Sequence, residues 1–120
     1  MNTCFVLAQD WQTLDAIDNI NNELDSNHVL SIDSTGNLNI QTIDFEHTNS
    51  FPLKEISEIY QELKFSTVFV VLTCTNEETC FFINDAGEVE NETFVYILEV
   101  PPNADAQFIV KELMFIKKRL

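Results

Sequence analysis

Carboxylates spaced to share one face of a helix are the residues of this chain that point most directly to a chemistry. Near the start of the chain, acidic and amide side chains recur at intervals of three and four residues, which places them on one side of a helix. No Lys or Arg precedes Lys54, so these acids have no ion-pair partner on their own helix. Such a face can steer and pair with the cationic groups of a partner. The predicted partner-binding residues here are Asp15, Asp18, Asn22, Glu23 and Asp25.

Trp11 falls on the same side of this predicted helix as Asp15 and Asp18, away from the apolar positions. Trp is enriched among the residues that dominate binding energy at protein interfaces, so a Trp amid acids predicts an interface anchor. The alternative is that Trp11, in the first turn of the helix, packs over the edge of a sheet. Both alternatives stay open at the level of the sequence.

Two further acidic clusters lie in the second half of the chain. Glu77 and Glu78 are adjacent in a short predicted loop. Glu88, Glu90 and Glu92 follow a period of two, which places them on one side of the chain if it is extended there. We expect both clusters to make secondary contacts with the same partner.

No pattern typical of a catalytic or metal centre occurs in the sequence. The two histidines, His28 and His47, have no second His or Cys within four residues in a zinc-like spacing. Cys74 lies in the most apolar predicted strand, where its thiol would stay neutral, and nothing near Cys80 would activate it. With only two glycines in the chain, glycine-rich phosphate-binding loops are excluded. We therefore expect no enzymatic activity, no cofactor and no metal.

The balance of charge narrows the class of partner. The chain has 20 acidic residues and six Lys or Arg, a formal net charge of -14, and four of the six bases lie in the last ten residues. Contacts to phosphate require cationic side chains, so this balance argues against direct binding to nucleic acid or to an anionic membrane. It favours a basic protein as partner. The alternative is an acidic surface that only keeps the chain soluble.

The sequence also predicts a compartment. The N-terminal residues lack the basic region and long apolar run of a signal peptide, and no apolar stretch approaches the length of a membrane span. We expect a cytoplasmic protein. Its three cysteines are Cys4, Cys74 and Cys80. Cys74 and Cys80 could pair across a hairpin, but a cytoplasmic chain is expected to hold reduced thiols packed as small apolar side chains.

Apolar periodicity and turn residues predict elements in the order β-α-β-β-α-β-β-β-α. Strands are expected at residues 4–8, 29–33, 38–45, 66–75, 79–84 and 93–100, with a hairpin turn at 34–37 and a bulge near 41–42. Helices are expected at residues 11–24, capped by Asp10, at 53–63, and up to residue 118, capped by Asn103 or Asp105. The strand at 66–75 is apolar on both sides, which predicts a central position in the sheet.

These elements predict a single α+β domain over residues 1–120, because two independent cores would each be marginal at this length. Tight turns between consecutive strands favour antiparallel pairing. The expected architecture is a mostly antiparallel sheet of five or six strands covered by three helices.

The charge and the acidic faces together favour an immunity or inhibitor protein, antitoxin-like in its role. It would bind a basic protein, with a bacterial nuclease toxin as the expected class, and occlude its cationic active site. One alternative is a DNA mimic that inhibits restriction or CRISPR enzymes, which requires carboxylates at phosphate-like spacing along a face. A small enzyme or ligand-binding domain with a generic acidic surface requires a deep pocket holding His28 or His47. A structural adaptor requires an exposed apolar patch on the last helix. The sequence predicts no oligomeric state.

Overall fold

The structure is a computed structural model that describes residues 11–24, 27–44, 47–74, 81–85, 88–93 and 95–120. Within these residues the chain forms two α-helices, one 3-10 helix and eight strands. The helices are α2 (Trp11–Glu23), η2 (Leu53–Glu55) and α3 (Ala106–Arg119). The strands are β1 (His28–Ile32), β2 (Asn37–Thr42), β3 (His47–Pro52), β4 (Ile56–Lys64), β5 (Thr67–Cys74), β6 (Phe81–Asp85), β7 (Glu88–Thr93) and β8 (Val95–Val100).

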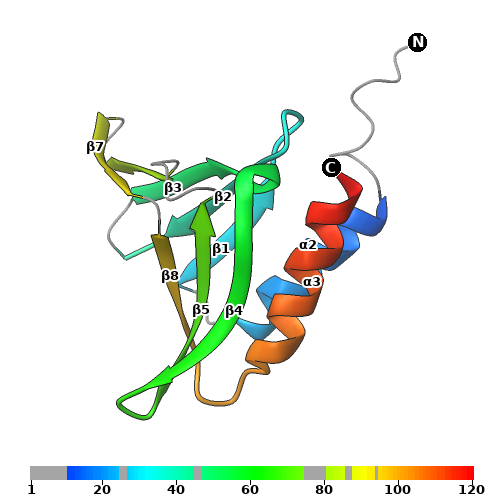
Figure 1. Cartoon of the computed structure of the whole chain (residues 1–120), viewed down its shortest axis with the longest axis vertical. Helices are drawn as coiled ribbons and strands as arrows, with labels where there is room; N and C mark the ends of the chain where they lie inside the picture. Colours follow the sequence, from blue (N-terminus) through cyan, green and yellow to red (C-terminus); the bar gives the residue numbers. More distant parts are fainter. Residues whose placement is uncertain (1–10, 25–26, 45–46, 75–80, 86–87, 94) are drawn as a thin grey trace.

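The strands form two antiparallel sheets instead of one. A five-stranded sheet has the order β1-β2-β3-β6-β7, and a three-stranded sheet has the order β4-β5-β8. The two α-helices pack against each other beside the strands (Figure 1). The predicted α+β class is confirmed, but the single sheet of five or six strands covered by three helices is wrong.

The largest difference from the prediction lies at residues 53–63, where a helix was expected. The chain makes one 3-10 turn there and continues as β4, a nine-residue strand. The apolar spacing does match a helix, but β5 is apolar on both faces, and its backbone groups need a hydrogen-bonded neighbour along each edge. β4 is one of these neighbours, paired from Ile56 opposite Cys74 to Lys64 opposite Thr67. Pairing between strands therefore outweighs the local helical pattern.

Other predicted elements are confirmed. α2 occupies the first predicted helix, and β1 and β2 form the predicted hairpin, in which Gly36 has a φ of 87°. α3 begins after Asp105, whose carboxylate accepts a hydrogen bond from the Phe108 N–H. β5 is central in its sheet. The bulge expected near 41–42 is wrong, because β1 and β2 stay in register as far as Thr42, where β2 ends. The predicted strand at 4–8, the cap at Asp10 and the loop at 76–78 lie outside the described residues.

Asp33 closes the turn between β1 and β2. Its Oδ1 accepts hydrogen bonds from the Thr35 N–H at 2.9 Å and from the Asn37 N–H at 3.1 Å. Burial alone would raise the pKa of Asp33, but these bonds and that of the Thr35 hydroxyl outweigh it and hold the pKa below its usual value. The ionised carboxylate therefore stabilises the turn.

One hydrophobic core joins the helices to both sheets. On α2 the core residues Ile17 and Ile20, and on α3 the core residues Ile109, Leu113 and Ile116, are three or four residues apart, so each helix buries one stripe. The sheets contribute Leu30, Leu38, Ile40, Val70, Leu72 and Leu98, among others. Burial of one such side chain stabilises a fold by about 1.5–3 kcal/mol. This shared core decides how the layers meet.

Asn21 attaches α2 to the edge of β1 that no described strand pairs. Its Nδ2 donates to the Leu30 carbonyl at 3.0 Å, and its Oδ1 accepts from the Leu30 N–H at 2.8 Å. β1 ends the five-stranded sheet, so this carboxamide satisfies backbone groups that a further strand would otherwise pair. The contact fixes the rotation of α2 and therefore decides which of its residues face solvent.

Tyr96 connects the three-stranded sheet to the five-stranded sheet. Its ring packs beside Phe51 of β3, with the ring centroids 5.9 Å apart, and its hydroxyl accepts a hydrogen bond from the Asn49 Nδ2 at 3.5 Å. Burial raises the pKa of Tyr96 to about 12, although the hydrogen bond from Asn49 opposes the shift. The fold therefore favours the neutral phenol.

The turn between β4 and β5 is strained. Phe65 and Ser66 are its two central residues, and their φ angles are 52° and 68°. Hairpin turns with positive φ at both positions prefer Asn-Gly, because a side chain clashes with the backbone in this conformation. Phe65 is 96% exposed, so packing of its ring does not offset the strain.

Replacing this pair with Phe65→Asn and Ser66→Gly should raise the free energy of unfolding by about 1–2 kcal/mol, because the strain is relieved and little packing is lost. Urea denaturation followed by far-UV circular dichroism measures the change. Ser66→Gly alone should give part of the gain. A double variant no more stable than the wild type would show that the turn stores no strain.

The raised pKa of Tyr96 predicts a loss of stability at alkaline pH. The phenol of the unfolded chain ionises near 10 and that of the folded chain near 12, so its contribution is complete below pH 10 and disappears as the pH rises toward 12. The loss should reach about 3 kcal/mol. Tyr96→Phe should flatten this part of the curve of stability against pH. Identical curves for the wild type and Tyr96→Phe would refute the assignment.

Candidate partner-binding surface

α2 has one side in the core and one side in solvent. Its buried side carries Thr13, Ala16, Ile17 and Ile20. Its exposed side carries Trp11, Asp15, Asp18 and Asn22. The acidic face predicted from residue spacing is therefore present as a solvent-facing surface. Asp25, which the prediction includes, lies outside the described residues.

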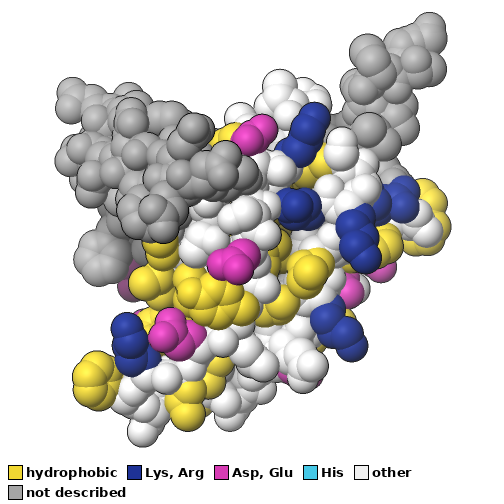
Figure 2. Space-filling model, in the orientation of Figure 1, with side chains coloured by type: hydrophobic (Ala, Val, Ile, Leu, Met, Phe, Trp, Pro, Cys, Tyr) yellow, Lys and Arg dark blue, Asp and Glu magenta, His cyan; other side chains and the backbone are white. Residues whose placement is uncertain are grey.

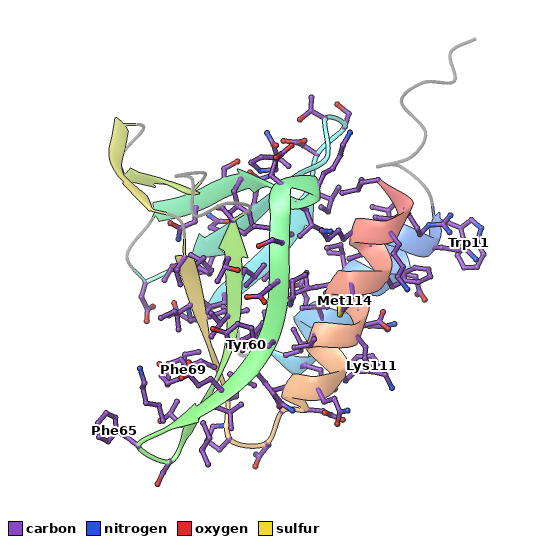
Figure 3. The ribbon with its side chains drawn as sticks, in the orientation of Figure 1. Trp11, Tyr60, Phe65, Phe69, Lys111 and Met114 are labelled. Atoms are coloured by element: carbon purple, nitrogen blue, oxygen red, sulfur yellow. The ribbon has the colours of Figure 1, made fainter. Side chains whose placement is uncertain are left out.

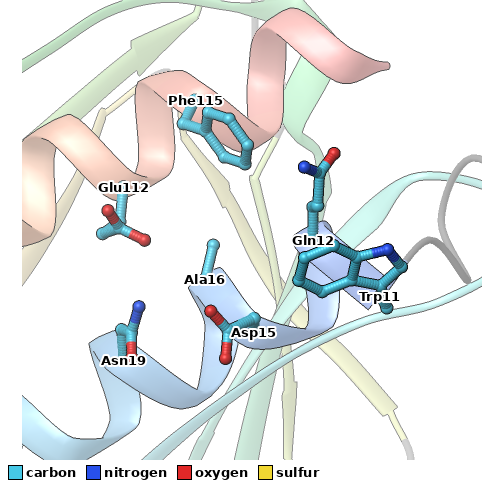
Figure 4. A pocket seen from close by; sticks show the side chains of 7 residues that line it. All are labelled: Trp11, Gln12, Asp15, Ala16, Asn19, Glu112 and Phe115. Atoms are coloured by element: carbon cyan, nitrogen blue, oxygen red, sulfur yellow. The ribbon is translucent and has the colours of Figure 1, made fainter.

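Trp11 projects from the start of α2 into solvent (Figure 3), and 72% of it is exposed. The alternative in which it packs over a sheet edge is wrong. Trp11 lines an open pocket of about 260 Å³ between α2 and α3 (Figure 4). The name Trp11 pocket is used below for the site formed by Trp11, Asp15, Asn19, Glu112 and Phe115.

The Trp11 pocket combines two aromatic rings with two carboxylates. Asp15 is exposed, and it makes no hydrogen bond or ion pair with any described residue. Aromatic faces attract Lys and Arg, and carboxylates pair with them. Arg119 shows this attraction within the chain, since its Cζ lies 5.4 Å from the centroid of the Phe115 ring. The Phe115 ring therefore already contacts a cation of this chain, and the Trp11 ring with Asp15 is the part of the pocket that suits a cationic side chain of a partner.

Glu112 and Phe115 were missed by reasoning from the sequence. Both lie on α3, which reaches the pocket only because the two helices pack side by side. The spacing within α3 shows which residues share a face, but it carries no signal for the partner of that face. Phe115 is 40% exposed although it lies between the two helices.

The bases of α3 change the charge of this surface. The start of α3 lies at the end of α2, where Asp105 contacts Glu23, and the later residue Phe115 lies near Trp11, so the helices are antiparallel. Lys117, Lys118 and Arg119 therefore lie toward the Trp11 end, and Lys and Arg side chains are prominent over the helices in Figure 2. The acids of α2 form a strip beside a basic strip, so the helical layer is not uniformly acidic.

Glu23 has a contact that the prediction did not anticipate. Its Oε1 accepts a hydrogen bond from the Asp105 N–H at 2.8 Å, and Asp105 in turn caps α3. This bond connects the end of α2 to the start of α3. Glu23 is therefore already engaged within the chain, whereas Asp15 and Asp18 are exposed.

The other predicted acidic clusters do not join the α2 face. Glu77 and Glu78 lie outside the described residues. Glu88, Glu90 and Glu92 lie in β7 at the end of the five-stranded sheet, on the opposite side of the molecule from the helices (Figure 1). The register between β6 and β7 shifts along this strand, so the assumed period of two does not run through it unbroken.

The described residues contain no group of three or more His, Cys, Asp or Glu that could hold a metal ion. No described helix combines the length and the apolar character that crossing a membrane would need. Cys74 is disulfide-bonded, which overturns the expectation that this thiol is reduced. Its possible partners, Cys4 and Cys80, both lie outside the described residues.

Comparison with protein-family models, curated proteins and solved structures finds no match for this chain. The functional argument therefore depends on the geometry of the described residues. That geometry offers an exposed aromatic anchor beside carboxylates at a shallow pocket, an arrangement suited to binding another protein.

Glu23→Ala should lower the free energy of unfolding by about 1 kcal/mol, because it removes a charge-assisted hydrogen bond between the helices. Asp18→Ala, at an exposed acid of the same helix, should change it by less than about 0.5 kcal/mol. Chemical denaturation of both variants measures the difference. Equal stabilities would contradict a structural role for Glu23.

Proposed function

We propose that this chain is an acidic immunity or inhibitor protein, which binds a basic protein and blocks its cationic active site. The partner class that fits is a bacterial nuclease toxin. The observation that carries the proposal is the Trp11 pocket, where an exposed indole stands beside Asp15 and Glu112. Exposure of so large an aromatic ring among carboxylates is typical of an interface anchor.

The chemistry of a nuclease explains why carboxylates would inhibit it. Such an enzyme grips the phosphates of its substrate with Lys and Arg, and a carboxylate can take the place of phosphate on the same cation. In the proposed complex, an Arg or Lys of the toxin lies on the indole of Trp11 and pairs with Asp15. Asp18 and Asn22, further along α2, contact neighbouring cations of the same site.

Long-range electrostatics would bring the partners together. A net charge of -14 attracts a basic protein from a distance and raises its rate of association. The basic strip on α3 repels the same partner locally. The partner would therefore approach from the α2 side, which gives the encounter a preferred orientation.

The proposal places the protein in the cytoplasm, where a nuclease toxin meets its substrates. The disulfide at Cys74 runs against this compartment, because such bonds persist mainly in oxidising surroundings. Capture from the native cell tests the partner and the compartment together, because the captured partner also shows in which compartment the chain acts.

Affinity capture from the native cell, with washes of increasing salt, should recover a basic nuclease whose activity the wild-type chain suppresses. Asp15→Lys and Asp18→Lys together should slow association with it at least about tenfold and weaken the salt dependence, because they reverse the attraction. Trp11→Ala should speed dissociation about tenfold or more. Stopped-flow kinetics and a nuclease assay measure these effects.

Asp44→Lys is the control for a charge reversal, because Asp44 is also exposed but lies in the turn after β2 and not on α2. It should leave the kinetics close to those of the wild type. If the captured partner has no nuclease activity, or if association is unchanged by the α2 reversals and by ionic strength, the proposal is wrong.

A further inference from the structure

The three-stranded sheet has an outer face that neither helix covers. Along β5, Val70 and Leu72 belong to the hydrophobic core, so the alternate residues Phe69 and Val71 lie on the opposite face. The register with β4 and β8 places further side chains beside them. We call this surface the sheet face and define it as Tyr60, Glu62, Phe69, Val71, Ile97 and Glu99.

An apolar row crosses the sheet face. Tyr60 of β4 and Ile97 of β8 lie opposite Val71 on either side. Tyr60 is 43% and Ile97 53% exposed, while Val71 is buried between them. Figure 2 shows hydrophobic side chains gathered into a band over this part of the molecule, with acidic side chains among them. A row across three strands is about 10 Å wide, close to the diameter of an α-helix.

A second row, with an acidic side chain at each end, lies next to the apolar row. Glu62 and Glu99 lie opposite Phe69 on either side, so one aromatic ring stands between two carboxylates. Side chains opposed in this way have Cβ atoms about 5 Å apart. Both glutamates are exposed, and neither forms a hydrogen bond or ion pair with a described residue. A cation placed over Phe69 would meet the ring and both carboxylates at once.

The strained β4–β5 turn continues this surface. Leu63, at the end of β4, is 69% exposed, and Phe65, at the tip, is 96% exposed. Figure 3 shows Phe65, Phe69 and Tyr60 on the same side of the molecule, with Trp11 on the other. Strain together with exposed apolar side chains indicates that this hairpin is kept for contact and not for stability.

We propose that the sheet face binds an amphipathic helix of a partner protein, with the apolar side of the helix on Tyr60 and Ile97 and an Arg or Lys over Phe69. This surface is separate from the Trp11 pocket, and the inference goes beyond the proposed function. Charge complementarity identifies the occupant, because in the described strands β4, β5 and β8 this side of the sheet carries Glu58, Glu62 and Glu99 and one base, Lys64. A second copy of the chain fits poorly, because each copy carries a net charge of -14.

The probe is a synthetic amphipathic peptide of Leu and Lys, about 15 residues long so that it can form a helix. A peptide with Glu in place of Lys is its counterpart. Two-dimensional NMR of the labelled chain should show that the Lys peptide shifts the amides of 58–62, 67–71 and 95–99. Trp11 is the single tryptophan of the chain, so unchanged Trp fluorescence separates this site from the Trp11 pocket.

Ile97→Lys should weaken binding of the Lys peptide at least about tenfold, because it breaks the apolar row and adds a like charge. Ile43→Lys is the matched control, since Ile43 is 44% exposed in a turn outside the sheet face. Glu62→Gln with Glu99→Gln, changes that preserve side-chain size, should weaken binding about fivefold and reduce its dependence on salt.

Binding that maps to the sheet face and is lost in Ile97→Lys but not in Ile43→Lys supports the proposal. It is overturned if neither peptide binds, if the Glu peptide binds as well as the Lys peptide, or if the shifts lie on α2 with a change in Trp fluorescence. Dimerisation of the wild type that Ile97→Lys abolishes would also overturn it. None of these results bears on capture of a nuclease through α2, so the two proposals fail separately.

Discussion

The pairing of β5 with a strand on each edge is the constraint on which the rest of the structure depends. The core side of β5 carries Val70, Leu72 and Cys74, and the opposite side of the strand is apolar too. The backbone N–H and C=O groups along both edges therefore lie in apolar surroundings, and each edge needs a neighbouring strand to pair with them. β4 and β8 satisfy these edges. β4 and β5 also contact α3, which completes the core.

The same constraint explains where sequence reasoning fails. Residues 53–63 have the apolar spacing of a helix. Most of them form β4 instead, because β4 supplies the hydrogen-bonded neighbour along one edge of β5. Local signals suffice where a cap or a turn is complete within a few residues, as at Asp105 and at Gly36. The division of strands into two sheets depends on contacts such as that between Tyr96 and Phe51, which no local pattern encodes.

The candidate site divides in the same way. The exposure of Asp15 and Asp18 follows from the period of one helix, so the sequence predicts it. The other wall of the Trp11 pocket, with Glu112 and Phe115, follows from the packing of α2 on α3, which spacing within either helix cannot reveal. Asp15, Asp18 and Asn22 of the predicted acidic face are exposed, but the antiparallel neighbour brings Lys117 and Arg119 toward the Trp11 end of α2.

Charge and topology together suggest why this fold leaves large side chains exposed on two sides. Both helices contribute to one core, so the outer side of α2 and the outer face of the three-stranded sheet point away from each other. Trp11 lies on one side, with Asp15 beside it in the pocket. Phe65 lies on the other side, at the tip of the hairpin whose strand β4 carries Glu62. Repulsion among so many carboxylates disfavours self-association and tolerates exposed apolar groups that would otherwise cause aggregation. An acidic surface therefore allows apolar anchors to stay exposed, and it selects cationic partners for them.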